Sequence, residues 1–177
     1  MQLLSRSWRA LILFVGLSML VVATAKAQSP TREIVVLEAS GPVAPTMANY
    51  ISRGLAEADE RNAEAVIIML DTPGGDGDTM LNIVQTIRTS DVPVIVFVGP
   101  RGAKAASAGL LITLAGHVAA MAPDTAIGAS SAVGPQGTEL GETAKQKGEQ
   151  YVGAQARSLA ERRGSEAVTL AEEAVFE

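Results

Sequence analysis

In this chain of 177 residues, uninterrupted apolar segments alternate with stretches whose apolar residues have the spacing of a helix. This pattern restricts the chain to a small set of folds. The strongest segments, residues 65–70 and 92–98, carry no charge and lack the apolar–polar alternation of a strand with one solvated face. We expect them to be strands that are buried on both faces. Two shorter apolar runs, residues 34–37 and 118–121, are also expected to be strands. Strands of this kind separated by helices are typical of a parallel sheet with helical crossovers. We therefore expect an α/β fold with a mainly parallel sheet.

The stretches between these segments predict the helices. Apolar residues recur at three- and four-residue spacing from Pro45 to about Arg61, and again over residues 78–90. The glycine-rich, polar segment 134–148 is typical of a mobile loop. Residues 151–163 predict a helix that ends at Gly164. Another helix is expected to begin near Glu166 and has no stop signal before the last residue, which indicates that the domain is truncated at its C-terminus.

The N-terminus has the three parts of a secretory signal peptide. Arg6 and Arg9 precede an uncharged run over residues 10–25, and a small-x-small cleavage site follows at residues 25–27. A run of about 16 residues is short for a membrane-spanning helix, which needs roughly 20. We expect cleavage after Ala27, a linker at 28–32, and an exported domain; an uncleaved N-terminal anchor is the alternative.

Composition excludes several classes of function. The chain has no cysteine and one histidine, so disulfide scaffolds, thiolate metal sites and zinc sites with several histidines are impossible. A net charge of -5 argues against a nucleic-acid-binding protein, which needs a basic patch against phosphates. No metal, cofactor or nucleic-acid partner is therefore expected.

Two turns lie where the expected strands end, at residues 71–77 and 99–109, and ligands of open α/β sheets bind at this edge. In the first turn, Gly74 and Gly75 let backbone N–H groups approach a ligand closely. In the second, Ser107 lies at or near a helix start, where unpaired N–H groups favour negative charge. A serine beside such donors suits acyl transfer with an oxyanion hole, although a cap or a packing residue is the commoner role.

Aspartates also cluster in the first turn. Asp71, Asp76 and Asp78 lack the ligand spacing of a calcium loop, so we expect helix capping by Asp78 instead.

A nucleophilic Ser107 needs a base. His117 is ten residues away, which is about 15 Å along one helix, and we interpret it as a helix-end residue. Lysine is the other common partner of serine. Lys104 is too close along the turn to face Ser107 easily, which leaves Lys145 and Lys147, or else two solvated surface lysines.

Five blocks of sequence occur in an order that closely resembles the N-terminal protease domain of NfeD-type membrane-bound serine proteases, which are related to signal peptide peptidase A and the Clp proteases. The blocks are Leu-Asp-Thr-Pro-Gly-Gly at 70–75, the Pro-Val strand at 93–94, Gly-Ala-Lys-Ala-Ala-Ser-Ala-Gly at 102–109, Ala-Ala-Met-Ala-Pro at 119–123 with Ile-Gly-Ala at 127–129, and Arg-Ser-Leu-Ala at 157–160. The resemblance covers residues 33–177.

This resemblance implies a Clp/crotonase-like fold of repeated ββα units and a Ser–Lys dyad. The serine of the family's Ala-Ser-Ala-Gly block corresponds to Ser107. The family's catalytic lysine precedes the Arg-Ser-Leu-Ala block by ten residues, which corresponds to Lys147. The implied oxyanion donors are the backbone N–H groups of Ala108 and Gly75, with Gly74 as the close alternative.

The resemblance also implies an extracytoplasmic serine endopeptidase, in the periplasm or at the cell surface. Its expected substrates are apolar segments of membrane-associated proteins, including stomatin-like partners. A homo-oligomer, dimeric or larger, is expected, as is attachment to the membrane through further segments beyond residue 177. The alternative is a non-catalytic domain of the same fold that binds a peptide or protein partner.

Overall fold

The structure is a computed structural model that describes residues 33–128 and 141–176. The predicted signal peptide and linker lie outside the described residues. Among the residues that are described, no helix has both the length and the apolar character needed to cross a membrane.

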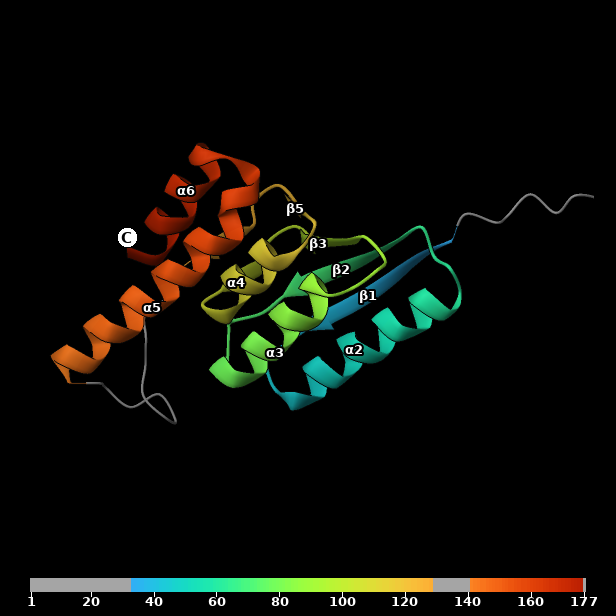
Figure 1. Cartoon of the computed structure of the whole chain (residues 1–177), viewed down its shortest axis with the longest axis horizontal. Helices are drawn as coiled ribbons and strands as arrows, with labels where there is room; N and C mark the ends of the chain where they lie inside the picture. The colour runs from blue at the N-terminus through green and yellow to red at the C-terminus, as the bar shows by residue number, and fades with distance from the viewer. Residues whose placement is uncertain (1–32, 129–140, 177) are drawn as a thin grey trace, which may run out of the picture. The chain divides into compact units, whose positions relative to one another are not determined.

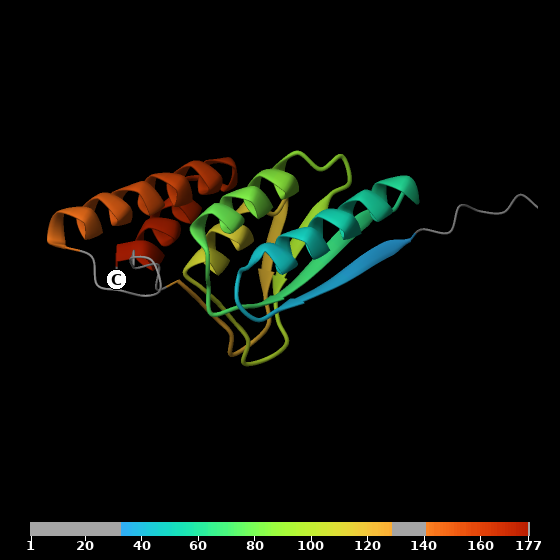
Figure 2. The same cartoon turned by 90° about the horizontal axis from the view of Figure 1, so that it is seen from below.

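A four-stranded sheet, in the order β1-β2-β3-β5, forms the centre of the fold, and every pair of neighbouring strands is parallel. Its strands are β1 (Ile34–Ser40), β2 (Ala65–Asp71), β3 (Val94–Val98) and β5 (Val118–Met121). Three helices connect them: α2 (Pro45–Glu60), α3 (Gly77–Arg88) and α4 (Ala108–Ala115). These helices lie together on one side of the sheet (Figure 1, Figure 2). The prediction of an α/β fold with a parallel sheet is confirmed.

The core lies between the sheet and these helices. In β2, Val66, Ile68 and Leu70 are fully buried, whereas the alternate residues are half-buried. The expectation that β2 is buried on both faces is therefore wrong for its second face. The same face is more exposed at the edges of the sheet, where Ile34 and Val118 each keep 53% of their surface accessible. A continuous apolar run thus marks this central strand even though only one of its faces is packed.

A second, two-stranded parallel sheet pairs β4 (Lys104–Ala106) with β6 (Ala126–Gly128). These strands were not predicted from the sequence, because three residues are too few to show a periodic pattern. Their position matters for function, since β4 runs directly into the residue that begins α4.

The C-terminal part consists of α5 (Glu142–Ala160), a 3-10 turn η2 (Glu161–Arg163) and α6 (Ser165–Phe176). Helix α5 packs against α4 and α6 (Figure 1). It begins at Glu142, so the part of the predicted loop that lies within the described residues is helical instead. Gly164 ends this helical segment with a φ of 95°, as predicted.

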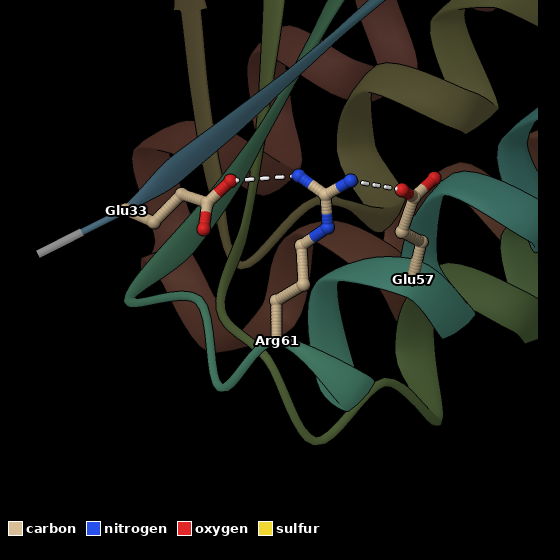
Figure 3. Close-up of polar contacts among 3 residues, drawn as sticks. All are labelled: Glu33, Glu57 and Arg61. Atoms are coloured by element: carbon tan, nitrogen blue, oxygen red, sulfur yellow. Dashed lines mark hydrogen bonds and ion pairs between the residues drawn. The ribbon is translucent and has the colours of Figure 1, made fainter. Parts of the chain in front are cut away.

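An exposed ion-pair network joins the end of α2 to the start of β1. The Arg61 guanidinium donates to the Glu33 carboxylate at 2.9 Å and to Glu57 one turn earlier in α2 (Figure 3). The hydrogen bond to Glu33 and the charges of both carboxylates raise the pKa of Arg61 above its usual value. The network connects the residue at which the chain leaves α2 with the residue before β1.

Candidate active site

Ser107 occupies a sharp turn between β4 and α4. Its φ of 52° and ψ of −116° lie outside the regions that a residue with a side chain normally adopts. It is the N-cap residue of α4, but its side chain makes no capping hydrogen bond. A serine held in a strained conformation on a strand-to-helix turn is the arrangement of the nucleophile elbow in α/β hydrolases. Such strain is typical of functional sites.

Backbone hydrogen bonds hold this turn in place. The Ser107 N–H donates to the Gly128 carbonyl of β6 at 2.9 Å, and the Ser107 carbonyl accepts from Leu110 N–H at 2.9 Å. The turn is thus bonded on one side to the small sheet and on the other to the first turn of α4.

The Pro-Gly-Gly loop after β2 packs directly against Ser107. A Cβ atom placed on Gly74 would lie 2.7 Å from Ser107 Cβ and 3.3 Å from its Oγ. Gly74 also has a φ of +100°, which a residue with a side chain rarely adopts. Only glycine allows the loop to approach the serine this closely.

Thr72 connects the glycine loop to the strand that leads to Ser107, and it was not singled out from the sequence. It is fully buried; its N–H donates to Lys104 O at 2.7 Å, and its carbonyl accepts from Ala106 N–H at 3.0 Å. Its Oγ1 accepts the Gly74 N–H at 3.1 Å. The sequence feature that could have identified Thr72 is its position, as a polar residue between an apolar strand and Pro-Gly-Gly.

The hydrogen bonds of this loop distinguish its N–H groups. Those of Gly74 and Asp76 are used within the fold, by Thr72 Oγ1 and by the Val43 carbonyl. No hydrogen bond from the Gly75 N–H to a described residue is present. The Ala108 N–H belongs to the first turn of α4, whose donors have no acceptor within the helix. The N–H groups of Gly75 and Ala108, the residues that follow Gly74 and Ser107, thus remain as candidate donors, whereas that of Gly74 is used by Thr72.

The aspartates of this loop have separate structural roles. Asp76, not Asp78, caps α3: its carboxylate accepts from the Thr79 N–H at 2.7 Å and from the Thr79 hydroxyl at 2.6 Å. The expectation for Asp78 is therefore wrong, because α3 begins one residue earlier and places Asp78 inside its first turn. Asp71 accepts the Lys104 N–H at 3.1 Å and so joins the two turns.

We expect the Asp76→Ala variant to unfold at a lower temperature than the wild-type protein at neutral pH. The hydrogen bonds from Thr79 lower the pKa of Asp76, so its contribution is present above the pKa of the unfolded chain and is lost as the pH falls through the lower folded value. An asparagine side chain can also cap a helix, so Asp76→Asn should retain most of the stability at pH 7. Thermal unfolding between pH 7 and pH 2 tests this: the gap between wild type and Asp76→Ala must close at low pH.

His117 has a structural role. Its Nδ1 accepts the Val94 N–H at 3.0 Å, which ties the end of α4 to the start of β3. It follows Gly116, the residue that caps α4, whereas Ser107 is at the other end of that helix. The helix-end interpretation of His117 agrees with this position.

Lys147 lies in the second turn of α5 and is exposed. Lys145 is two residues nearer the start of the same helix. Among the residues of α5 whose exposure the structure describes, the first buried one is Gly153, so these residues do not enclose Lys147 in an apolar cleft. The structure therefore places the glycine loop and the start of α4 against Ser107, whereas Lys147, the described one of the two candidate bases, is exposed. Among the described residues there is no cluster of three potential metal ligands.

Comparisons of sequence identify relatives of this chain. Residues 33–175 match the family described as NfeD1b, N-terminal domain. The membrane-bound protease PH1510 of Pyrococcus horikoshii is 46% identical over 114 residues, which is 64% of this chain and 26% of that protein. The membrane protein NfeD1b of Bacillus subtilis is 29% identical over 140 residues, or 79% of this chain and 31% of that one. The chain thus spans about a quarter to a third of the length of these relatives, both of which are membrane proteins.

Solved structures show the same fold. The 1510-N membrane-bound stomatin-specific protease, as a serine-to-alanine variant, superposes with a TM-score of 0.72 at 40% identity, over 81% of this chain and 69% of that one. A lysine-to-alanine variant of 1510-N, in complex with a substrate peptide, has the same TM-score and identity over 81% and 65%. ClpP1 from Listeria monocytogenes superposes with a TM-score of 0.59 at 17% identity, over 81% and 79%, so the fold is ClpP-like.

Proposed function

The chain belongs to the family of NfeD1b N-terminal domains, and we propose that it is the catalytic domain of a serine endopeptidase that uses Ser107 and Lys147. The observation that carries the proposal is the strained turn at Ser107, which packs against a glycine loop. Relatives with a membrane-bound protease activity in their names support it.

In the proposed mechanism, Ser107 Oγ attacks the carbonyl carbon of the scissile peptide bond. The neutral amine of Lys147 accepts the hydroxyl proton and then donates it to the leaving amine as the acyl-enzyme forms. The N–H groups of Gly75 and Ala108 stabilise the oxyanion. Water then attacks the ester, with the same amine accepting and returning a proton, and releases the free serine and the carboxylic acid.

Spacing along the chain supports Lys147 over Lys145. The serine and the lysine that were replaced in the two 1510-N variants are 41 residues apart in that protein. Ser107 is 40 residues before Lys147 and 38 before Lys145. A lysine becomes a neutral base near pH 7 only when apolar surroundings lower its pKa. The exposed Lys147 of the single chain must therefore be enclosed by bound substrate or by other protein segments before it acts.

A fluorophosphonate probe tests the dyad directly, because it forms a covalent bond only with an activated serine. We expect labelling of the wild-type protein, at Ser107, as identified by peptide mass. Lys147→Ala should reduce the labelling rate by at least about 100-fold, the size of a typical general-base contribution. Lys145→Ala is the matched control on the same helix and should label like the wild-type protein.

Equal labelling of Lys147→Ala and wild type would contradict the dyad. A folded protein that does not label between pH 6 and pH 10 would instead support a domain of this fold that binds a peptide without cleaving it. The exposed position of Lys147 is the one observation that favours this second function.

The remaining parts of the proposal follow from the relatives. By analogy with the stomatin-specific 1510-N protease, the proposed substrates are apolar segments of membrane-associated proteins, including a stomatin-like protein. We place the domain on the extracytoplasmic side of the membrane, as a homo-oligomer, after cleavage of residues 1–27. Residues 33–177 form the protease domain in this proposal, with membrane attachment through further segments.

A further inference from the structure

Three arginine side chains line one small pocket at the end of α4 opposite Ser107. They are Arg88, the last residue of α3, and Arg162 and Arg163 of η2. Leu114, Leu159 and His117 complete most of the lining. No carboxylate is among the lining residues, although the chain as a whole has a net charge of -5.

One of these arginines is held rigidly. The Arg163 guanidinium donates to the carbonyls of Leu114 at 2.8 Å, Leu159 at 3.2 Å and Gly116 at 2.6 Å. Burial, followed by the positive charges of Arg162 and Arg88, lowers the pKa of Arg163. The charges of both neighbours thus act on Arg163, and all three side chains line the same pocket.

Neither Arg88 nor Arg162 has a carboxylate partner among the described residues. The other arginines with ion pairs, Arg61, Arg101 and Arg157, each contact an aspartate or glutamate. The pocket thus gathers three guanidinium groups with no acidic side chain in its lining.

Helix dipoles neutralise only part of this charge. The pocket lies where α3, α4 and the α5–η2 segment end, and each helix C-terminus carries about half a negative charge. These partial negative charges are smaller than the three full positive charges of the arginines, so the pocket still favours an anionic ligand.

The pocket volume limits what that ligand is. Its volume of about 110 Å³ exceeds the roughly 30 Å³ of a water molecule several-fold, but it is well below the 300 Å³ of a site for a whole metabolite. Arginine forks match tetrahedral phosphate oxygens. A groove of about 490 Å³ between α3 and α5 shares Arg88 and Leu159 with the pocket and has room for the remainder of a larger molecule.

We propose that Arg88, Arg162 and Arg163 form a binding site for a phosphate group at the C-terminal end of α4. The group comes either from a soluble phosphate compound or from the headgroup of an anionic phospholipid. The site is independent of the proposed proteolysis, because none of its residues belongs to the turn of Ser107 or to the glycine loop.

Thermal unfolding of the full chain, with chloride replaced by inorganic phosphate at constant ionic strength, tests the site. Saturating phosphate should raise the unfolding midpoint of the wild-type protein by about 2–6 °C. Arg88→Ala and Arg162→Ala should each weaken phosphate affinity at least tenfold, since each removes charge-assisted hydrogen bonds. Arg163 is left unchanged in this test because its hydrogen bonds hold the end of α4.

Arg53→Ala is the control variant. Arg53 lies on α2, lines a different pocket, and its replacement removes the same charge. This variant should retain the full phosphate response. No response in the wild-type protein, or an equal response in all four proteins, would overturn the proposal.

The source of the phosphate group is tested with vesicles of phosphatidylcholine, with and without phosphatidic acid. The site binds a lipid headgroup if the wild-type protein co-sediments only with vesicles that contain phosphatidic acid, and if Arg88→Ala and Arg162→Ala do not co-sediment with them. Binding of free phosphate without such co-sedimentation assigns it to a soluble compound, and failure of both overturns the site.

Discussion

Replacing Ser107 with alanine is expected to abolish peptide hydrolysis and to leave the fold almost unchanged. The substitution removes the oxygen that attacks the substrate, and loss of a serine nucleophile lowers kcat by on the order of 10⁴–10⁶-fold. The side chain is small and lies at the edge of the core, so the change in unfolding free energy should stay below about 1 kcal/mol. Hydrolysis of a quenched-fluorescent peptide with an apolar core, together with thermal unfolding, measures both quantities.

Ser107→Gly separates the catalytic role from the backbone strain. Glycine adopts a φ of 52° without the cost that a side chain incurs, which is of order 1–3 kcal/mol. The flexibility of glycine in the unfolded chain offsets about 0.5–1 kcal/mol of that gain. We therefore expect Ser107→Gly to be inactive yet more stable than wild type by about 1 kcal/mol. Retained hydrolysis in either variant contradicts the proposed mechanism, and a less stable Ser107→Gly contradicts the strain.

The central sheet could be predicted from sequence because its strands are continuously apolar. Residues 118–121 form a strand with the predicted bounds, and the run at 65–70 extends by only one residue. The small sheet of β4 and β6 could not be predicted, since its strands obtain their order from pairing with each other and from the bridge between Thr72 and Ala105. Long-range pairing of this kind leaves no local pattern.

The beginning of α5 illustrates a different limit. Residues 142–150 are mostly polar and include Gly148, and none of those whose exposure the structure describes is fully buried. Without a packed face there is no apolar periodicity, so the sequence looks like a loop. This difference affects the candidate site, because Lys145 and Lys147 lie in this half of a helix rather than at the end of a mobile loop.

Local sequence also predicted where the candidate site lies but not how its parts contact one another. The two turns at the end of β2 and before α4 were expected to face the same edge of the sheet. That Gly74 lies against Ser107, while Thr72 holds both turns, depends on the hydrogen bonds of Thr72 to Lys104 and Ala106. The first residue of α3 decides which aspartate caps the helix. Because α3 begins at Gly77, Asp76 rather than Asp78 is the cap.

The second large effect is expected for Gly74→Ala, which should both destabilise the protein and lower its activity. Two costs add: the φ of +100° disfavours any side chain by about 1–2 kcal/mol, and the new methyl group would lie 2.7 Å from Ser107 Cβ and 3.0 Å from the Ala106 carbonyl oxygen. Overpacking of this kind costs typically about 1–3 kcal/mol. We expect a loss of about 2–5 kcal/mol in unfolding free energy, measured by chemical denaturation.

Two other glycines of the chain separate these costs. Gly102 has a φ of +84° with open space around its Cβ position, so Gly102→Ala should lose only the backbone cost of about 1–2 kcal/mol. Gly77, in the first turn of α3, has open space and no positive φ, so Gly77→Ala should be neutral or slightly stabilising. If Gly74→Ala is no less stable than Gly102→Ala, the loop does not pack on Ser107 as described. Both variants carry similar backbone strain, because both glycines have a positive φ. Reduced serine labelling in Gly74→Ala, with normal labelling in Gly102→Ala, would therefore assign the loss of activity to the contact between the glycine loop and Ser107.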